Sequence, residues 1–240
     1  MARAVVVGAG LGGLASAIAL ARRGWEVTVL ERRDPPAAVG ADIALWPNAL
    51  RALDALGVGA PVRAAGTVEI AGGVRTASGR WLTRLDTAAL RRRQGDGVVV
   101  LARPDLYALL LAAAPPVRAG VAVGADPGDV EPGDAATPAV VHDDGGGRHE
   151  AELVVAADGL HSAIRSAFWP ASTPRATGST ACRLVAEHAL DAGGESWGRG
   201  EYAGLGPLPG GRTYLFAVVP TDEVPTADGA EILPWLRDRF

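Results

Sequence analysis

The sequence predicts an α/β fold, with a parallel sheet and helices in one domain and shorter strands in a second. Three patterns indicate this fold. An apolar run, a glycine-rich turn and a helical pattern follow one another at the amino terminus. A second apolar run, 151–157, leads into an Asp-Gly turn. The chain beyond Pro170 is rich in Gly, Pro, Trp and Tyr and contains short alternating runs such as 212–219, which are typical of antiparallel strands.

The amino-terminal unit reads as strand, turn, helix and strand. Ala4 to Val7 is an apolar run suited to a strand buried on both faces, and residues 8–13, GAGLGG, match G-x-G-x-x-G. A helix is predicted from the apolar residues that follow at i, i+3, i+4 and i+7, which are Leu11, Leu14, Ala15 and Ile18. Gly24 can take the left-handed conformation that ends the helix, and a second strand covers 26–30.

The spacing within this unit predicts a dinucleotide site. Gly8 permits the tight turn, Gly10 lets a pyrophosphate approach the backbone, and Gly13 allows close packing of helix and strand. Glu31 lies 18 residues beyond Gly13, where a carboxylate accepts hydrogen bonds from an adenosine ribose. The residues predicted to bind the nucleotide are Gly8, Gly10, Leu11, Gly13, Glu31 and Arg32.

Arg32 and Arg33 leave a choice of nucleotide open. Two arginines beside the acid are compatible with an NADP 2′-phosphate, but the Glu31 carboxylate would repel that phosphate. A contact of Arg32 with adenine or phosphate, or plain exposure to solvent, explains the arginines without NADP.

Composition excludes several other classes of function. No charged residue occurs from Ala4 to Ala21, but four glycines interrupt this run, so we expect neither a membrane span nor a signal peptide. The net charge is −4, so nucleic acid is not an expected partner. The single Cys182 gives no internal disulfide, and no His or Cys near it has metal-ligand spacing, so no metal site is expected. We expect a cytoplasmic protein.

Five segments together carry a resemblance to a known family. They are the fingerprint that ends at Glu31, GADIALWPNALRALDALG at 40–57, LARPDLYALLL at 101–111, ADGLHSAIR at 157–165 and WGRGEYAGLGPLPGGRTYLFAVVP at 197–220. In this order they resemble the ADP-binding motif, the G-x-x-I-x-L-x-P-N-A segment, the Arg-x-x-Leu helix start, the Asp-Gly motif and the substrate-domain strands of the flavoprotein aromatic hydroxylases. These FAD-dependent monooxygenases include para-hydroxybenzoate, salicylate and urate hydroxylases.

The resemblance adds four residues to the candidate FAD site. By likeness, Arg103 reaches FAD and Val130 offers its backbone to the adenine. Asp158 and Gly159 belong to the motif associated with both FAD and NAD(P)H, although an Asp-Gly pair by itself is also a common turn.

The resemblance implies a Rossmann-like FAD-binding domain interrupted by a β-rich substrate domain. Residues 1–71 and 98–169 would form the first, and residues 72–97 and 170–240 the second. The family's third motif, Gly-Asp followed by Ala-His-Pro, completes the FAD domain but does not occur in this sequence. We therefore expect the first part of a longer protein, completed by a missing carboxyl-terminal segment or a complementing chain, and poor FAD binding by this chain alone.

The implied reaction is the hydroxylation of an aromatic or similarly electron-rich small molecule with NAD(P)H and O2. Arg183 and Tyr214 are the candidate catalytic residues, with Tyr202 beside them. A surface salt bridge explains Arg183 equally well, and ordinary packing is an alternative for the tyrosines. Arg91 to Arg93 are expected in a solvated loop.

Two other functions stay open at this point. One is another FAD oxidoreductase of the same fold, of the halogenase or polyprenyl reductase type. The other is a truncated remnant that binds nucleotide without catalysis. The sequence names neither the substrate nor the choice between NADH and NADPH.

Overall fold

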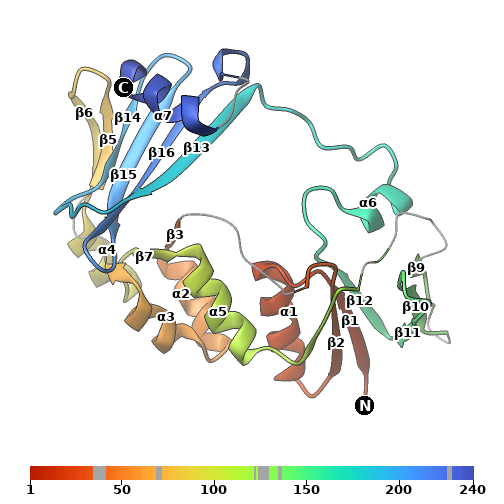
Figure 1. The fold of residues 1–240 in the computed structure, drawn as a ribbon. Helices are drawn as coiled ribbons and strands as arrows, with labels where there is room; N and C mark the ends of the chain where they lie inside the picture. Colours follow the sequence, from red (N-terminus) through yellow and green to blue (C-terminus); the bar gives the residue numbers. More distant parts are fainter. Residues whose placement is uncertain (35–41, 69–71, 122, 124–129, 135–136, 226–228) are drawn as a thin grey trace. The chain divides into compact units, whose positions relative to one another are not determined.

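The computed structural model describes residues 1–34, 42–68, 72–121, 123, 130–134, 137–225 and 229–240 (Figure 1). The chain divides into two compact units. Unit 1 comprises Met1–Val39, Leu53–Gly59 and Pro104–Arg175. Unit 2 comprises Gly40–Ala52, Ala60–Arg103 and Ala176–Phe240. Each unit has its own sheets.

A parallel sheet with strand order β12-β1-β2-β8 forms the centre of unit 1. Its strands are β1 (Arg3–Val7), β2 (Glu26–Glu31), β8 (Val117–Ala119) and β12 (Leu153–Ala156). β1 lies between β12 and β2, and its residues Ala4 to Val7 are at most 5% exposed. This confirms the predicted strand that is buried on both faces, because apolar side chains on both sides of β1 are removed from water.

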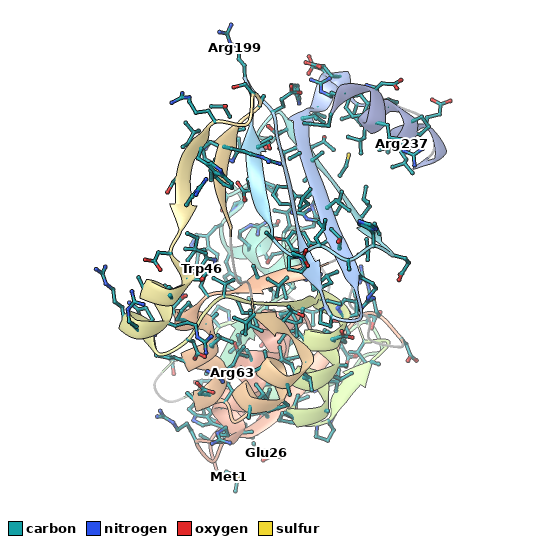
Figure 2. All side chains as sticks on the ribbon, turned by 90° about the vertical axis from the view of Figure 1, so that its left-hand side faces the viewer. Met1, Glu26, Trp46, Arg63, Arg199 and Arg237 are labelled. Atoms are coloured by element: carbon teal, nitrogen blue, oxygen red, sulfur yellow. The ribbon has the colours of Figure 1, made fainter. Side chains whose placement is uncertain are left out.

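The helix and the turn after β1 also form as predicted. α1 spans Leu11–Ala21 and buries Leu14, Ala17 and Ile18. Gly24 has a φ of +82° and ends the helical segment, after which β2 begins. The amino ends of the two strands lie at one edge of the sheet, where Figure 2 labels Met1 and Glu26 and where the Glu26 N–H donates to the Ala2 carbonyl at 2.9 Å. The glycine turn therefore lies at the opposite end of the strands, where their carboxyl ends are.

A small antiparallel sheet of order β11-β10-β9 packs on the parallel sheet. It consists of β9 (Val130–Glu131), β10 (Ala139–His142) and β11 (Arg148–Ala151). Figure 1 shows α1 on one face of the parallel sheet and these strands on the other. The shared core contains seven buried residues, which are Val5, Val7, Leu30, Val130, Val141, Ala151 and Ile164. α6 (Ala163–Phe168) contributes Ile164.

The prediction of a single strand over 151–157 is wrong. The structure ends β11 at Ala151 and begins a separate strand, β12, at Leu153. β12 is also less buried than its apolar sequence suggests, since Leu153 is 36% exposed. The reason is its place in the sheet: within the described residues β12 pairs on one side only, with β1.

The turn between β10 and β11 is held by a histidine–carboxylate pair. His149 Nε2 lies 2.7 Å from Asp143 Oδ2, and the two side chains are 10% and 11% exposed. Asp143 Oδ1 accepts the N–H groups of Gly145 and Gly147 at 3.0 and 2.7 Å. The hydrogen bond from His149, followed by that from Gly147, lowers the pKa of Asp143 below its ordinary value.

Asp143→Asn is expected to lower the free energy of unfolding by about 1–3 kcal/mol at neutral pH, because buried partners lose a charged acceptor. Since the pKa of Asp143 is lower in the folded chain than in the unfolded chain, its contribution is present above the unfolded pKa, near 4, and is lost as the pH falls through the folded pKa. Urea unfolding of wild type and variant at neutral and acidic pH measures this. The two curves should converge in acid. A gap that persists there, or an equal effect of Asp144→Asn at the exposed neighbour, would contradict the assignment.

The main sheet of unit 2 has six strands in the order β13-β16-β15-β14-β5-β6. The strands are β5 (Gly72–Thr76), β6 (Trp81–Leu85), β13 (Ser179–Ala186), β14 (Gly194–Trp197), β15 (Tyr202–Leu208) and β16 (Arg212–Pro220). All neighbours are antiparallel except β14 and β5. The strand at 212–219 confirms the corresponding sequence prediction. Arg199, in the turn between β14 and β15, points away from the sheet (Figure 2).

Shorter elements complete the chain. A three-stranded sheet of order β3-β7-β4 contains β3 (Asp42–Leu45), β4 (Thr67–Val68) and β7 (Val99–Ala102). The remaining helices are α2 (Pro47–Ala55), α3 (Gly59–Ala65), α4 (Thr87–Gln94), α5 (Arg103–Ala113), the 3-10 helix η2 (Thr221–Glu223) and α7 (Gly229–Arg239). None of the helices in the described ranges combines the length and apolarity that crossing a bilayer takes.

The loop predicted for Arg91 to Arg93 is wrong, because these residues lie in the last turn of α4. The Asp86 carboxylate caps the start of the helix by accepting the Ala89 N–H at 2.7 Å, and Gly95 ends it with a φ of +83°. Positive side chains in the last turn stabilise a helix because they lie at the negative end of its dipole. The run of charged and polar residues over 91–94 therefore reflects an exposed helix end.

Candidate functional site

The glycine turn of unit 1 is shaped by two contacts that only glycine allows. Gly8 has a φ of +101°, and a Cβ there would meet the carbonyl oxygen of Ala157, the residue after β12. A Cβ on Gly13 would meet the Gly8 carbonyl oxygen and lie 3.3 Å from the Ala157 Cβ. The Gly8 N–H donates to the Leu30 carbonyl at 2.8 Å, so the turn is fixed to both neighbouring strands.

The amino end of α1 faces open space beside this turn. Gly10 is the N-cap and supplies no side-chain cap, and the first helical hydrogen bond is from Leu14 N to Gly10 O at 2.9 Å. The first N–H groups of a helix have no partner within it, and they carry its positive dipole end. A Cβ on Gly10 or Gly12 would meet nothing within 4 Å. This arrangement can bind the phosphates of a nucleotide.

Glu31 is held at the edge of the same turn by backbone donors. Its Oε2 accepts the Ala9 N–H at 2.8 Å, and its Oε1 accepts the Arg33 N–H at 3.0 Å. The carboxylate is thus fixed at Ala9, the residue between Gly8 and Gly10, beside the place where a ribose attached to the phosphates would lie. Arg32 is exposed beside it.

Tyr107 was not among the predicted site residues, yet it interacts with Glu31. It lies on α5, is 6% exposed, and has its pKa raised by burial and, to a lesser degree, by the charge of Glu31. In the sequence its position is indistinguishable from that of the apolar core residues of the same helix, so no sequence signal separates it from them.

Asp158 follows β12 and supplies a buried acceptor. Its Oδ2 accepts the Ile164 N–H at 3.2 Å, whereas its buried Oδ1 has no hydrogen-bond partner in the described part of the chain. A buried acceptor without a donor is costly, and a ligand hydroxyl would satisfy it. Gly159 follows with a φ of +90°. The N–H groups at the start of α1 can bind phosphate, and the Glu31 carboxylate and the unbonded Asp158 Oδ1 can accept hydrogen bonds. Together these groups suit FAD, which carries phosphates and hydroxyls.

Ser162 and Arg165 fix the loop that carries Asp158. The resemblance placed both in the motif associated with FAD and NAD(P)H, but neither was named among the candidate site residues. Ser162 is 5% exposed and caps α6 by accepting the Arg165 N–H at 2.9 Å. The Arg165 guanidinium donates to the Leu160 carbonyl at 2.6 Å and the Ser172 carbonyl at 3.1 Å. The serine before a helical pattern is a readable N-cap signal, whereas the bonds of the arginine depend on the fold of the loop.

The other predicted cofactor residues lie in three different places. Leu11 is the first residue of α1. Val130 is 7% exposed, packs in the core with Val7 and Leu30, and has its backbone in β9 opposite Val141. Arg103 begins α5 and is half-buried.

Arg183 and Tyr214 lie on one face of the main sheet of unit 2. Arg183 pairs with Phe216 and Val185 with Tyr214, and residues two apart on a strand share a face. On this face ring centroids lie 6.5 Å apart for Tyr214 and Phe216, 6.0 Å for Phe216 and Tyr202, and 6.1 Å for Tyr202 and Trp197. We call Arg183 with these four rings the aromatic face.

Glycines of β15 support the rings of the aromatic face. A Cβ on Gly204 would lie 2.5 Å from Phe216 Cζ, and a Cβ on Gly206 would lie 2.8 Å from Tyr214 Cζ. The Phe216 and Tyr214 rings therefore occupy the space that side chains at 204 and 206 would fill. Tyr214 also packs against the core of Val98, Val100 and Leu208, which agrees with the packing interpretation of this tyrosine.

Asp42 is an acidic neighbour of Arg183 that sequence reasoning did not find. Burial raises the pKa of the Asp42 carboxyl, and the positive charge of Arg183 opposes that rise. Arg183 itself is exposed. The two residues are far apart in sequence, and only the packing of β3 in unit 2 brings their charges within reach.

A sequence profile of the family described as "FAD binding domain" matches residues 1–186. The chain belongs to this FAD-binding family. The resemblance to FAD-dependent aromatic hydroxylases and the predicted α/β fold are thereby confirmed, and the relatives bear them out. The chain is 34% identical over 190 residues to a 3-hydroxybenzoate 6-hydroxylase of Klebsiella oxytoca, covering 78% of this chain. It is 40% identical over 162 residues to a 2-heptyl-3-hydroxy-4(1H)-quinolone synthase of Mycobacteroides abscessus, covering 68%.

A solved structure extends the similarity over almost the whole chain. The structure of Klebsiella pneumoniae HpxO complexed with FAD and uric acid superimposes with a TM-score of 0.80 at 26% identity and covers 99% of this chain and 61% of that chain. The chain spans about half the length of the curated relatives that it matches, 47% of the first and 41% of the second.

Proposed function

We propose that this chain forms the FAD-binding and substrate-binding parts of a monooxygenase that uses NAD(P)H and O2 to hydroxylate an aromatic or similarly electron-rich small molecule. The observation that carries the proposal is the cradle at the carboxyl ends of β1, β2 and β12. Three features there can bind the phosphates and hydroxyls of one ligand. They are the open amino end of α1, the fixed Glu31 carboxylate and Asp158 Oδ1, which has no partner in the described part of the chain. Unit 1 is the cofactor domain and unit 2 the substrate domain in this proposal.

Each cradle residue has a defined task toward the cofactor. The N–H groups at the start of α1 bind the pyrophosphate, and Gly10 keeps its approach open. Glu31 accepts hydrogen bonds from the ribose, and Asp158 Oδ1 accepts one from a cofactor hydroxyl. Bound FAD supplies the redox chemistry, taking electrons from NAD(P)H and passing them to O2.

The aromatic face supplies substrate binding. Its rings offer apolar surface to a planar molecule and exclude water, and the exposed Arg183 guanidinium can pair with an anionic group on that molecule. Relatives point to this substrate class, since one is named for 3-hydroxybenzoate and another is complexed with uric acid. Because NAD(P)H is the reductant, the proposed place of the reaction is the cytoplasm.

The test is a titration of the purified chain with FAD, followed by oxidation assays with NADH and NADPH in the presence of phenolic acids. We expect weak FAD binding by this chain alone. Once the predicted carboxyl-terminal segment or complementing chain is supplied, we expect NAD(P)H consumption that a substrate stimulates, and transfer of one atom of isotopically labelled O2 into the product. A chain that binds FAD and consumes NAD(P)H, but never transfers labelled oxygen to any electron-rich aromatic, would contradict the proposed reaction.

Arg183→Gln is expected to raise the KM for an anionic aromatic substrate about tenfold with a smaller effect on kcat, because the lost interaction is charge-assisted. Steady-state kinetics measure the two constants. Arg199→Gln is the matched control, since Arg199 lies in a turn of the same unit and points to solvent (Figure 2). A KM unchanged in Arg183→Gln would remove this residue from the substrate site.

A further inference from the structure

A hollow with a volume of about 350 Å³ lies on the main sheet of unit 2. It is lined by Arg75 of β5, Trp81 and Arg84 of β6, Leu205 of β15 and the Gly193–Gly194 segment at the start of β14. Small-molecule sites begin at about 300 Å³, so the hollow has room for one small ring and its substituents.

The hollow lies on the sheet face opposite the aromatic face. Arg75 Nε donates to Ser196 Oγ at 2.9 Å, and Ser196 pairs with Ala203, which shares its face with Leu205. Gly206, the next residue, lies under the Tyr214 ring on the other face. Arg75 and Leu205 therefore face away from the rings of the aromatic face.

The two arginines give the hollow a positive charge. Arg84 lies over the Trp81 ring, with its Cζ 4.8 Å from the ring centroid, and Arg75 bonds to the neutral Ser196 hydroxyl. In the described ranges neither guanidinium has a carboxylate within 4 Å. Both contacts fix the side chains and leave further N–H donors at the guanidinium edges, because each guanidinium carries five.

The other walls suit an apolar, flat body. Leu205 and the edge of Trp81 are apolar, and Gly193 and Gly194 present backbone without side chains. We propose that the hollow binds a small aromatic carboxylate, with the carboxylate between Arg75 and Arg84 and the ring against the glycine wall. This site is additional to the substrate site and does not depend on the proposed reaction.

The experiment follows the indole N–H signal of Trp81 by NMR in the full chain, with Trp81→Phe to identify the signal. Benzoate is the probe, benzamide is its neutral equivalent, and inorganic phosphate tests charge without a ring. We expect benzoate to shift the signal in a saturable way and the other two to bind at least about fivefold more weakly. Raising the salt concentration about tenfold should weaken benzoate binding several-fold.

Variants then show which arginines bind the carboxylate of benzoate. Arg75→Gln and Arg84→Gln should each weaken benzoate binding at least about fivefold, whereas Arg80→Gln, in the turn of the same hairpin and outside the hollow, should not. Arg183→Gln should leave the Trp81 response unchanged, which separates this site from the substrate site. Equal binding of benzamide or phosphate, an effect of Arg80→Gln as large as that of Arg75→Gln, or loss of the response in Arg183→Gln would each overturn the proposal.

Discussion

Gly13→Ala is expected to destabilise unit 1 by about 3 kcal/mol or more, the upper range for overpacking of a close contact. The added methyl group would press on the Gly8 carbonyl oxygen and the Ala157 side chain, both of which belong to the rigid turn. Relief requires α1 to move away from β1, which also opens the cradle. Thermal and urea unfolding followed by circular dichroism measure the loss.

Gly12→Ala is the matched control in the same helix. A Cβ on Gly12 meets nothing within 4 Å, and alanine favours a helix over glycine by about 0.5–1 kcal/mol. The neighbouring substitution should therefore leave stability unchanged or raise it. If both variants unfold at the same urea concentration, the contact of Gly13 does not determine the packing of this unit.

Glu31→Gln is expected to reduce the affinity for ADP and for FAD at least about tenfold, since hydrogen bonds to a charged acceptor contribute about 1.5–3 kcal/mol. The amide retains one acceptor for the Ala9 N–H but removes the negative charge that the ribose hydroxyls would meet. Isothermal titration calorimetry with ADP measures the effect without any need for catalysis.

Glu26→Gln serves as the control for Glu31→Gln. Glu26 begins the same strand, is exposed, and lies at the opposite edge of the sheet (Figure 2). ADP affinity should stay within about twofold of wild type. Should Glu31→Gln bind ADP as tightly as Glu26→Gln does, with both chains folded, the cradle would need another ribose contact.

The predictable parts of the fold are those that local chemistry determines. β1, α1 and β2 follow from apolar period and from glycines placed at a turn, and all three form as predicted. The helix of Arg91 to Arg93 was missed because a short exposed helix has no apolar period; its signals were the Asp86 cap and Gly95. The strand predicted over 151–157 ran across the end of β11 because no Gly or Pro marks the break at Glu152.

The candidate site divides in the same way. Gly8, Gly13 and Glu31 were predicted from their spacing, and the structure explains their geometry through contacts with each other's turn and, for the two glycines, with Ala157 after β12. The interactions of Tyr107 with Glu31 and of Asp42 with Arg183 were beyond prediction, because each joins residues far apart in the chain through tertiary packing. The roles of all the candidates stay predictions that binding and kinetic measurements can decide; they are Gly8, Gly10, Leu11, Gly13, Glu31, Arg32, Arg103, Val130, Asp158 and Gly159 for the cofactor, and Arg183 and Tyr214 for catalysis.

The fit of Gly8 against Ala157 has a consequence for how the protein is made. Arg3 and Glu152, joined by a hydrogen bond of 2.6 Å, are 149 positions apart, so β12 can pair with β1 only after most of unit 1 has left the ribosome. Until then the glycine turn lacks its contact with Ala157, and Asp158 has not yet been synthesised. Nucleotide binding should therefore be a late event in biosynthesis, and bound nucleotide would stabilise the finished unit by mass action.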